Sequence, residues 1–299
     1  MGAAPNVMLG MTMPELAAWS ERVVVALGQN PGLFTGPGTN TYLVGTGRRR
    51  ILVDTGQGKP AYLPVLERAL AHAGAEGIQE IVLTHGHPDH VGGLRDVLAR
   101  FGPLRVSKRP DPETDDLGLV PVEAIDEGSV IRTEGATLRA LHAPGHARDH
   151  LCFWLEEERA LFSGDNVLGV GTTVIPSEGG DLLDYLGSLE RLLGEAPRRI
   201  YPAHGPVIED GVAKLREYLD HRAQRERQIL GALRASGAPA LVPELVARIY
   251  VDVPEVLHAA AAHSVAAHLL KLEREGRARR HPDGAVGPPP ALRARWSLV

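Results

Sequence analysis

The sequence predicts an α+β protein, in which two β-sheets pack between helices and a smaller helical domain follows. Three observations support this prediction. β-Rich runs outnumber helical patterns in the first 210 residues, glycine and proline separate them without a regular βαβ alternation, and long amphipathic helices come last. The 299 residues, 43% of them hydrophobic, suffice for two cores. We therefore expect one domain over residues 1–210 and another over residues 211–299.

The larger domain is expected to contain nine short strands and three helices. The helical patterns cover residues 60–73, 91–101 and 182–193. The segments 109–116 and 176–181 are expected to be loops, and the second is expected to overhang a functional site. The predicted strands cover residues 41–44, 50–54, 81–84, 104–106, 129–133, 137–142, 150–155, 159–163 and 199–202.

The smaller domain begins with one long, charged amphipathic helix over residues 211–235. Two further helices are predicted over residues 241–250 and 254–275, the second starting at a proline and ending before a glycine. Residues 277–280 and 292–299, separated by a Gly/Pro-rich bend, could pair as a short hairpin. Helices followed by a terminal hairpin suggest a winged helix-turn-helix unit.

The charge is distributed unevenly along the chain. Residues 1–210 contain 18 Lys and Arg and 28 Asp and Glu, a net charge of −10, whereas residues 211–299 contain 14 and 9, a net charge of +5. An acidic first part suits a site that holds cations, and a basic second part could meet a polyanion. The alternative is that the surplus arginines form a solvated face.

The single cysteine and the N-terminal segment indicate the cellular compartment in which the protein is expected. Cys152 is the only cysteine, so no disulfide can form within the chain, and its apolar surroundings predict a buried structural thiol. The N-terminal segment lacks a secretion signal, and no apolar stretch approaches 18 residues. We expect a soluble protein with no membrane partner that is cytoplasmic, or in the mitochondrial matrix if the source is eukaryotic.

The strongest chemical signal is the segment THGHPDH at positions 84–90, which lies between a predicted strand and a predicted helix. A strand-to-helix turn can direct several closely spaced side chains at one point, which a regular strand cannot do. Three imidazoles and a carboxylate within six residues suit Zn²⁺ and are compatible with iron or manganese. The candidate ligands are His85, His87, Asp89 and His90.

Three later residues complete a candidate ligand set. His146, Asp165 and His204 each follow a predicted strand. Each of them alone would more often be an ordinary loop or core residue. Together they indicate one edge of a sheet sandwich where metal ligands converge.

The order H-x-H-x-D-H, G-H, G-D and a final H resembles the metallo-β-lactamase superfamily over roughly residues 20–210. The resemblance implies a four-layer αβ/βα sandwich and two divalent metal ions, most readily Zn²⁺. It also implies that Asp54, in the DTG segment at 54–56, supports the metal-binding turn without touching metal. Carried over by motif, His85, His87 and His146 would bind the first metal, Asp89, His90 and His204 the second, with Asp165 as the bridging carboxylate.

Further segments resemble the β-lactamase-like protein 2 family, over nearly the whole chain. They are GTNTY at 38–42, TEGATL at 133–138, GTT at 171–173 and HGPVI at 204–208. That resemblance implies a winged-helix-like C-terminal domain and, from animal members, endoribonuclease activity on single-stranded RNA. One class of true β-lactamases has a cysteine among the second metal's ligands, and Asp165 would take that role here.

Several other polar residues have alternative interpretations. Asn40 and Thr41 could bind substrate in the cleft or could simply form a turn. His142 and His150 lie close enough to His146 in sequence to support a ligand. The remaining histidines are expected on helices or in the tail, with surface or packing roles.

These observations predict a binuclear hydrolase in which a metal-bound hydroxide attacks phosphorus or a carbonyl carbon. Asp89 would ligate metal, accept the water's proton, or do both. The first expectation for the substrate is single-stranded RNA, as in a phosphodiesterase or endoribonuclease with little sequence preference. The runner-up is a small acyl substrate, as in an ester, thioester or lactone hydrolase, and a mononuclear-iron persulfide dioxygenase comes third.

A non-enzymatic alternative is a nucleic-acid-binding regulator. In that case a winged-helix unit would contact phosphates through the basic cluster Arg274, Arg277, Arg279 and Arg280. Winged-helix units also serve only to pack or dimerise, so a homodimer is possible, and the sequence leaves the oligomeric state open.

Overall fold

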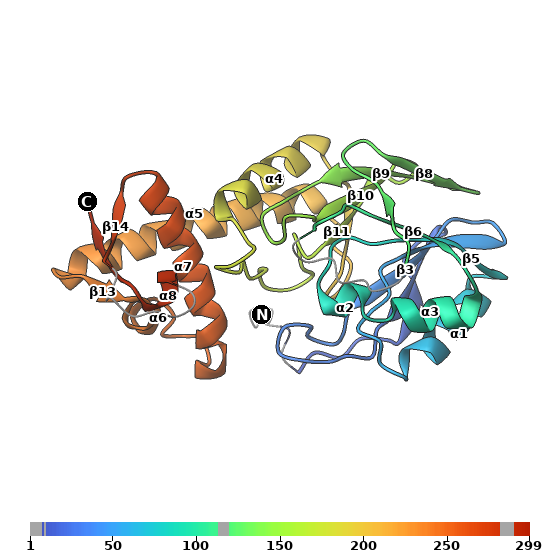
Figure 1. Ribbon diagram of the computed structural model, residues 1–299, viewed down its shortest axis with the longest axis horizontal. Coiled ribbons are helices and arrows are strands. Elements are labelled where there is room, and N and C mark those ends of the chain that lie inside the picture. Colours follow the sequence, from blue (N-terminus) through green and yellow to red (C-terminus); the bar gives the residue numbers. More distant parts are fainter. Residues whose placement is uncertain (1–7, 9, 113–119, 282–289) are drawn as a thin grey trace. The chain divides into compact units, whose positions relative to one another are not determined.

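The computed structural model describes residues 8, 10–112, 120–281 and 290–299, which form two compact units (Figure 1). The first unit comprises the described residues up to Ala143, Asp149–Thr172 and Leu192–Lys214. The second comprises Pro144–Arg148, Thr173–Arg191 and the described residues from Leu215. The second unit thus includes two segments that lie before the predicted boundary at residue 210.

The first unit contains a seven-stranded sheet whose strands follow one another in chain order. Strands β1 to β4 are antiparallel, and β4 to β7 are parallel. The sequence prediction missed β1, β2 and β7, because short or uninterrupted apolar runs lack the alternation that indicates a strand. The strands are β1 (Leu16–Ala18), β2 (Val23–Leu27), β3 (Asn40–Val44), β4 (Arg49–Val53), β5 (Gly77–Val82), β6 (Arg105–Lys108) and β7 (Glu123–Ala124).

A second sheet of five strands has the order β12-β11-β10-β9-β8. Its neighbours are antiparallel except β11 and β12, which run parallel. All five strands were predicted, with small differences at their ends. They are β8 (Val130–Thr133), β9 (Ala136–His142), β10 (Leu151–Leu155), β11 (Ala160–Gly164) and β12 (Arg199–Pro202).

The two sheets enclose a common core, to which buried Tyr42, Phe153, Phe162 and Tyr201 contribute. A second apolar cluster joins the other face of the first sheet to helices α1 (Tyr62–His72) and α3 (Leu94–Phe101). Figure 1 shows these helices on one side of the sheet that carries β3 and β5, with β8 to β11 on the other side. Because strands of the first sheet are buried on both faces, their sequences are almost continuously apolar.

The helix predicted over residues 91–101 is divided in two. A short helix α2 (Pro88–Val91) precedes α3, and Gly92 and Gly93 lie between them. A Cβ added at Gly93 would lie 2.0 Å from the carbonyl oxygen of Thr55, so only glycine allows this close approach. The pair of glycines therefore holds the turn that carries THGHPDH against the loop after β4.

The second unit contains its own apolar core around fully buried Trp296. Its three-stranded sheet has the order β13-β15-β14, and the predicted terminal hairpin is present because β15 pairs antiparallel with β14. No described helix is both long and apolar enough to cross a membrane. The remaining elements are α4 (Leu182–Glu195), α5 (Gly211–Ser236), β13 (Ala240–Leu241), α6 (Val242–Ile249), η1 (Glu255–Leu257), α7 (His258–Arg274), β14 (Ala278–His281), α8 (Pro290–Arg293) and β15 (Arg295–Leu298).

Candidate metal centre

The turn between β5 and α2 carries four of the predicted ligands. His87 has extended backbone and caps the helix, and Pro88 occupies the first helical turn, where its missing N–H leaves no hydrogen bond unmade. Asp89 and His90 follow within this one turn, so their side chains lie close to the end of β5. His85 and His90 are fully buried.

The Asp54 carboxylate lies behind the turn and contacts Thr84 and His90. Its carboxylate accepts hydrogen bonds from the Thr84 backbone N–H at 2.8 Å and the Thr84 hydroxyl at 2.9 Å, and it lies 2.8 Å from His90 Nδ1. Asp54 adopts a left-handed backbone with φ of 58° and is 2% exposed. Because the carboxylate must accept at Nδ1, His90 carries its proton there, and Nε2 keeps the lone pair that a metal requires.

The three later ligands lie after strand ends in the structure, as predicted. His146 follows β9, Asp165 follows β11 directly, and His204 follows β12. A backbone bridge between Thr39 and His204 and a hydrogen bond from Gly169 N–H to the His204 carbonyl fix the last of these segments.

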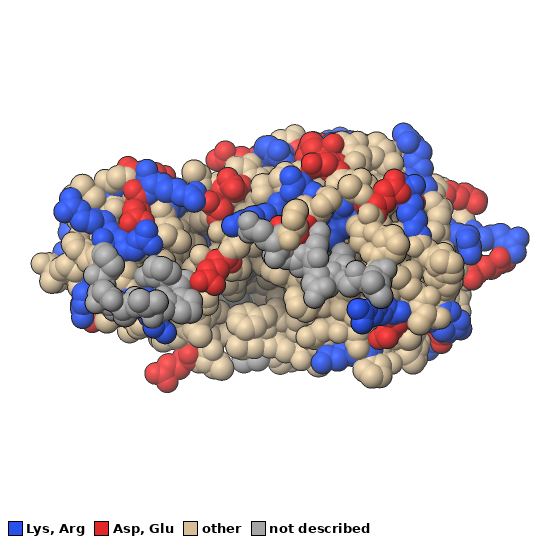
Figure 2. All heavy atoms as spheres, in the orientation of Figure 1, with Lys and Arg blue, Asp and Glu red and all other residues tan. Residues whose placement is uncertain are grey.

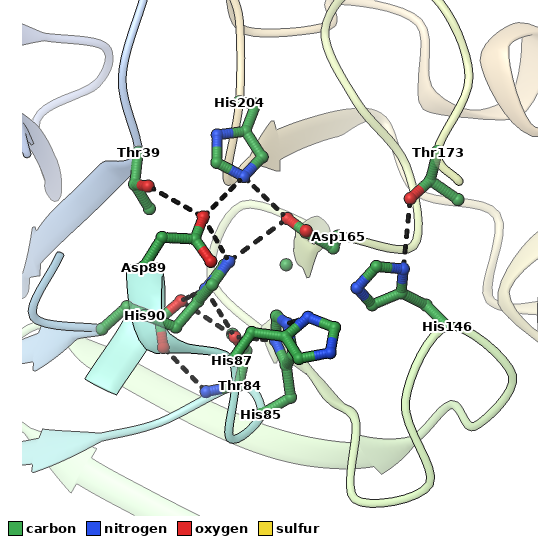
Figure 3. Close-up of polar contacts among 12 residues, drawn as sticks. Thr39, Thr84, His85, His87, Asp89, His90, His146, Asp165, Thr173 and His204 are labelled. Carbon is green, nitrogen blue, oxygen red and sulfur yellow. Dashed lines mark hydrogen bonds and ion pairs between the residues drawn. The ribbon is translucent and has the colours of Figure 1, made fainter. Parts of the chain in front are cut away.

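The structure brings all seven predicted ligands into two groups (Figure 3). Within each group the candidate ligand atoms lie within 4.8 Å of one another. Asp165 Oδ1 also lies 3.4 Å from His90 Nε2 and 3.1 Å from His204 Nε2, which is the placement expected of a carboxylate shared by two metals. The groups are His85, His87, His146 and Asp165, and Asp89, His90 and His204.

Buried polar atoms at the centre support a cation there. His90 Nε2 makes no hydrogen bond within the described part of the chain, although the side chain is fully buried. The carboxylates of Asp89 and Asp165 point at this nitrogen from 3.5 and 3.4 Å. Because an unsatisfied buried nitrogen is costly, a divalent ion between these groups fits the site well.

The pKa shifts of the site residues in the metal-free protein also show that the site favours positive charge. Burial lowers the pKa of His204, but Asp165 and Asp89 outweigh it and raise the pKa to about 9. Burial also lowers the pKa of His90, yet Asp89, Asp54 and Asp165 raise it well above its usual value. His90 and His204 overcome the effect of burial on Asp89 and lower its pKa to about 2. Protons therefore occupy positions that metal ions would take.

His85 behaves differently from His90 and His204. Burial and the neighbouring His90 and His150 hold its pKa well below the usual value, so the imidazole stays neutral. Its Nδ1 lies 3.0 Å from the Thr84 hydroxyl, and Nε2 lies 2.9 Å from His87 Nδ1. A neutral imidazole is the form that binds metal.

Three threonines were not singled out as functional residues. Thr84 contacts both Asp54 and His85, Thr39 lies 3.2 Å from Asp89 Oδ2, and Thr173 lies 3.3 Å from His146 Nδ1. Asn30 in turn holds Thr39 through two hydrogen bonds. All three threonines fall within the motif segments that the sequence had marked, so the motifs indicated them without giving their roles.

Asn40 and Thr41, predicted to bind substrate, have buried structural contacts instead. The Asn40 amide donates to the carbonyls of Pro202 and Gly205, and the Thr41 hydroxyl donates to Ala26. Both side chains are almost fully buried, so the structure gives the substrate-binding prediction no support. A strand residue alternates between faces, and this orientation could not be read from the GTNTY motif alone.

His150 is the flanking histidine that supports the site. Its Nε2 accepts a hydrogen bond from the Asp165 backbone N–H at 3.1 Å, and its ring lies 4.9 Å from that of His85. His142 pairs with Leu151 in the sheet and is in neither candidate ligand group.

Comparisons with known families agree with this geometry. Residues 34–204 match the metallo-β-lactamase superfamily, and residues 242–287 match the β-lactamase-associated winged helix domain. The chain therefore belongs to the metallo-β-lactamase superfamily, whose members are in general metal-dependent hydrolases. It combines the superfamily's α+β sandwich with a C-terminal winged helix domain, as the sequence predicted.

Individual relatives refine the comparison. A β-lactamase-like protein 2 homologue from Caenorhabditis elegans is 41% identical over 86% of this chain and 86% of its own length. An atrochrysone carboxyl ACP thioesterase from Aspergillus chevalieri is 44% identical over 81% of this chain and 78% of its own. A metallo-β-lactamase family protein from Thermus thermophilus has a TM-score of 0.74 at 25% identity, covering 94% of this chain and all of that one.

Proposed function

We propose that this protein is a binuclear metal-dependent hydrolase that cleaves acyl thioesters, with zinc as its metal. The observation that supports hydrolase activity is the pair of candidate ligand groups around Asp165. These groups offer imidazole and carboxylate donors to two divalent ions. Divalent ions held there would polarise the scissile carbonyl and lower the pKa of water to near 7.

The chain's own residues would orient the reaction. Water would add to the carbonyl carbon, the C–S bond would break, and the thiolate would leave with a proton, giving a carboxylate and a thiol. Asp89, whose pKa is lowered to about 2 by His90 and His204 against the effect of burial, is ionised at neutral pH and can accept a hydrogen bond from that water. Thr39, 3.2 Å from Asp89 Oδ2, would hold the carboxylate in place.

Acyl substrates rank above RNA because the basic cluster that was expected to contact phosphates is largely neutralised. Arg274 pairs with Asp181, Arg277 with Glu226 and Glu275, and Arg280 with Glu273. Figure 2 shows acidic side chains next to basic ones among the residues that it draws in colour. The thioesterase among the relatives adds independent support for acyl chemistry.

Endoribonuclease action on single-stranded RNA is the second candidate. It is favoured by the net charge of +5 over residues 211–299 and by the winged helix domain. The same ligand groups would serve, with a phosphodiester in place of the thioester.

One experiment separates the two candidates. Zinc-loaded protein would be incubated with thioesters of short acyl chains on N-acetylcysteamine and on acyl carrier protein, and in parallel with labelled single-stranded RNA. We expect thioester cleavage that is lost with chelator and in Asp165→Asn, and retained in Asp126→Asn, whose carboxylate pairs with Arg109 at the surface.

Metal-dependent RNA cleavage without thioester cleavage would replace the first candidate by the second. RNA cleavage that persists in Asp165→Asn would reveal a contaminating nuclease. Cleavage of neither substrate class would refute both.

A further inference from the structure

The segment that holds His146 rests on a buried arginine of the long helix α5. His146 Nδ1 lies 2.9 Å from the carbonyl oxygen of Val174 and 3.3 Å from the Thr173 hydroxyl (Figure 3). The carbonyl can only accept, so Nδ1 carries the proton and Nε2 is left as the ligand atom. The orientation of this imidazole therefore depends on where the backbone of residues 173 and 174 lies.

Arg222 fixes that backbone. One Nη2 hydrogen of Arg222 donates to the carbonyl oxygen of Thr173 at 2.6 Å, and the side chain is only 2% exposed. No carboxylate forms an ion pair with Arg222 among the residues that the structure describes. A buried guanidinium without an acidic partner is costly, so the hydrogen bond to the Thr173 carbonyl is one of the contacts that offset its burial.

The same arginine also reaches the residue before His146 through Tyr185. The guanidinium lies over the Tyr185 ring at 5.3 Å from its centroid. Gly145, with φ of 126°, packs so closely on Tyr185 that an added Cβ would lie 2.3 Å from its Cα. Arg222 thus contacts both the backbone beside His146 Nδ1 and the ring of Tyr185, the residue whose Cα and Cβ pack on Gly145.

Other contacts hold the far end of the segment that begins at Thr173. Ser177 Oγ lies 3.1 Å from His263 Nδ1, and Asp181 pairs with Arg274. The backbone N–H of Asp181 donates to the carbonyl of Gly145 at 2.8 Å, which ties the segment back to His146. With its far end held in this way, the segment depends on Arg222 at the end nearest the ligand.

We infer that Arg222 is a positioning residue for the metal centre, acting through Thr173, Val174 and His146. This inference rests on the proposed binding of two ions. It assigns a supporting role in the metal centre to a residue that lies outside all of the ligand motifs. Removal of such a supporting contact typically weakens metal affinity about 10–100-fold. The expected effect of losing Arg222 is therefore a selective loss of the ion that His146 would bind.

The test compares Arg222→Met with Arg225→Met, its neighbour one turn along α5, whose guanidinium stacks on Tyr250 at 3.8 Å instead. Zinc content would be measured by elemental analysis, affinity by competition with a chromophoric chelator, and ligand geometry by the visible spectrum of the cobalt form. We expect wild type and Arg225→Met to bind two ions alike. Arg222→Met should bind one ion about tenfold or more weakly, with an altered cobalt spectrum.

Arg222→Lys, which retains a donor near the Thr173 carbonyl, should recover most of the affinity. If Arg222→Met does not fold by circular dichroism, Arg222→Gln takes its place, because its amide is too short to make the same contact. A folded variant of either kind that binds both ions with wild-type affinity would overturn the inference. A wild-type protein that binds no second ion would instead refute the proposed function.

Discussion

Asp54→Asn separates the charge of this residue from its backbone role. Asn tolerates the left-handed conformation that Asp54 adopts at φ of 58°, so the turn after β4 should survive the change. The Asn carbonyl can still accept from the Thr84 backbone N–H, which donates to Asp54 at 2.8 Å in the structure. What the substitution removes is the negatively charged acceptor that faces His90 Nδ1.

The structure sets the size of the effect. His90 Nδ1 lies 2.8 Å from Asp54 Oδ2 in a fully buried position, and a buried hydrogen bond to a charged group contributes about 1.5–3 kcal/mol. The amide of Asn would place a donor against Nδ1–H, so His90 would move its proton to Nε2 or rotate. Either response removes a ligand from the group formed with Asp89 and His204. Affinity for that ion should fall about 10–100-fold, which corresponds to roughly 1.4–2.7 kcal/mol.

Titration of the metal-free protein with zinc, monitored by a competing chelator, measures this effect. Wild type and Asp126→Asn, a surface control whose carboxylate pairs with Arg109 and accepts from the Glu127 N–H, should show two tight sites. Asp54→Asn should keep one tight site and weaken the other. Two sites of wild-type affinity in a folded Asp54→Asn protein would show that Asp54 does not direct His90.

Three further predictions concern other parts of the molecule. Cys152→Ala, at a fully buried position, should lower the free energy of unfolding by about 1 kcal/mol or more and leave the turnover rate within a few-fold. The stabilisation from protonated His204, whose pKa is raised to about 9, is complete below its ordinary value of 6.5 and is lost as pH rises through 9. The melting temperature of the metal-free protein should therefore fall over this window, and His204→Gln should reduce that fall, to which the raised pKa of His90 contributes in the same direction. The fourfold alanine variant of the arginine cluster, in which Arg274, Arg277 and Arg280 have acidic partners, should leave the salt dependence of any RNA binding unchanged. A flatter slope would restore a phosphate-binding role for the cluster Arg274, Arg277, Arg279 and Arg280.

The positions of the candidate ligands could be predicted because the sequence signal for each of them is local. THGHPDH gathers four donors within one turn, and His146, Asp165 and His204 each follow a β-rich run. Strand ends that share one edge of a sandwich must converge, so seven positions could be predicted without coordinates. The two groups that they form are the arrangement which the resemblance to the metallo-β-lactamase superfamily implied.

The contacts that support the ligands could not be predicted in the same way. Arg222 lies 49 positions from Thr173, and the segment between them contains a helix and a strand. Asn40 lies two positions after Gly38 of the GTNTY motif but turns its amide inward to Pro202, because the side of a strand that a residue faces is set by tertiary pairing. The paired arginines appeared as a basic cluster because their acidic partners, such as Asp181 and Glu226, are distant in the sequence.

The central claim is that these seven side chains hold two metal ions around a shared Asp165. Anomalous diffraction from a zinc-loaded crystal, collected at the zinc absorption edge, tests it most directly. The predicted result is two strong peaks per chain, one bordered by His85, His87 and His146, the other by Asp89, His90 and His204, with Asp165 reaching both. A single peak, or peaks away from these side chains, would contradict the claim.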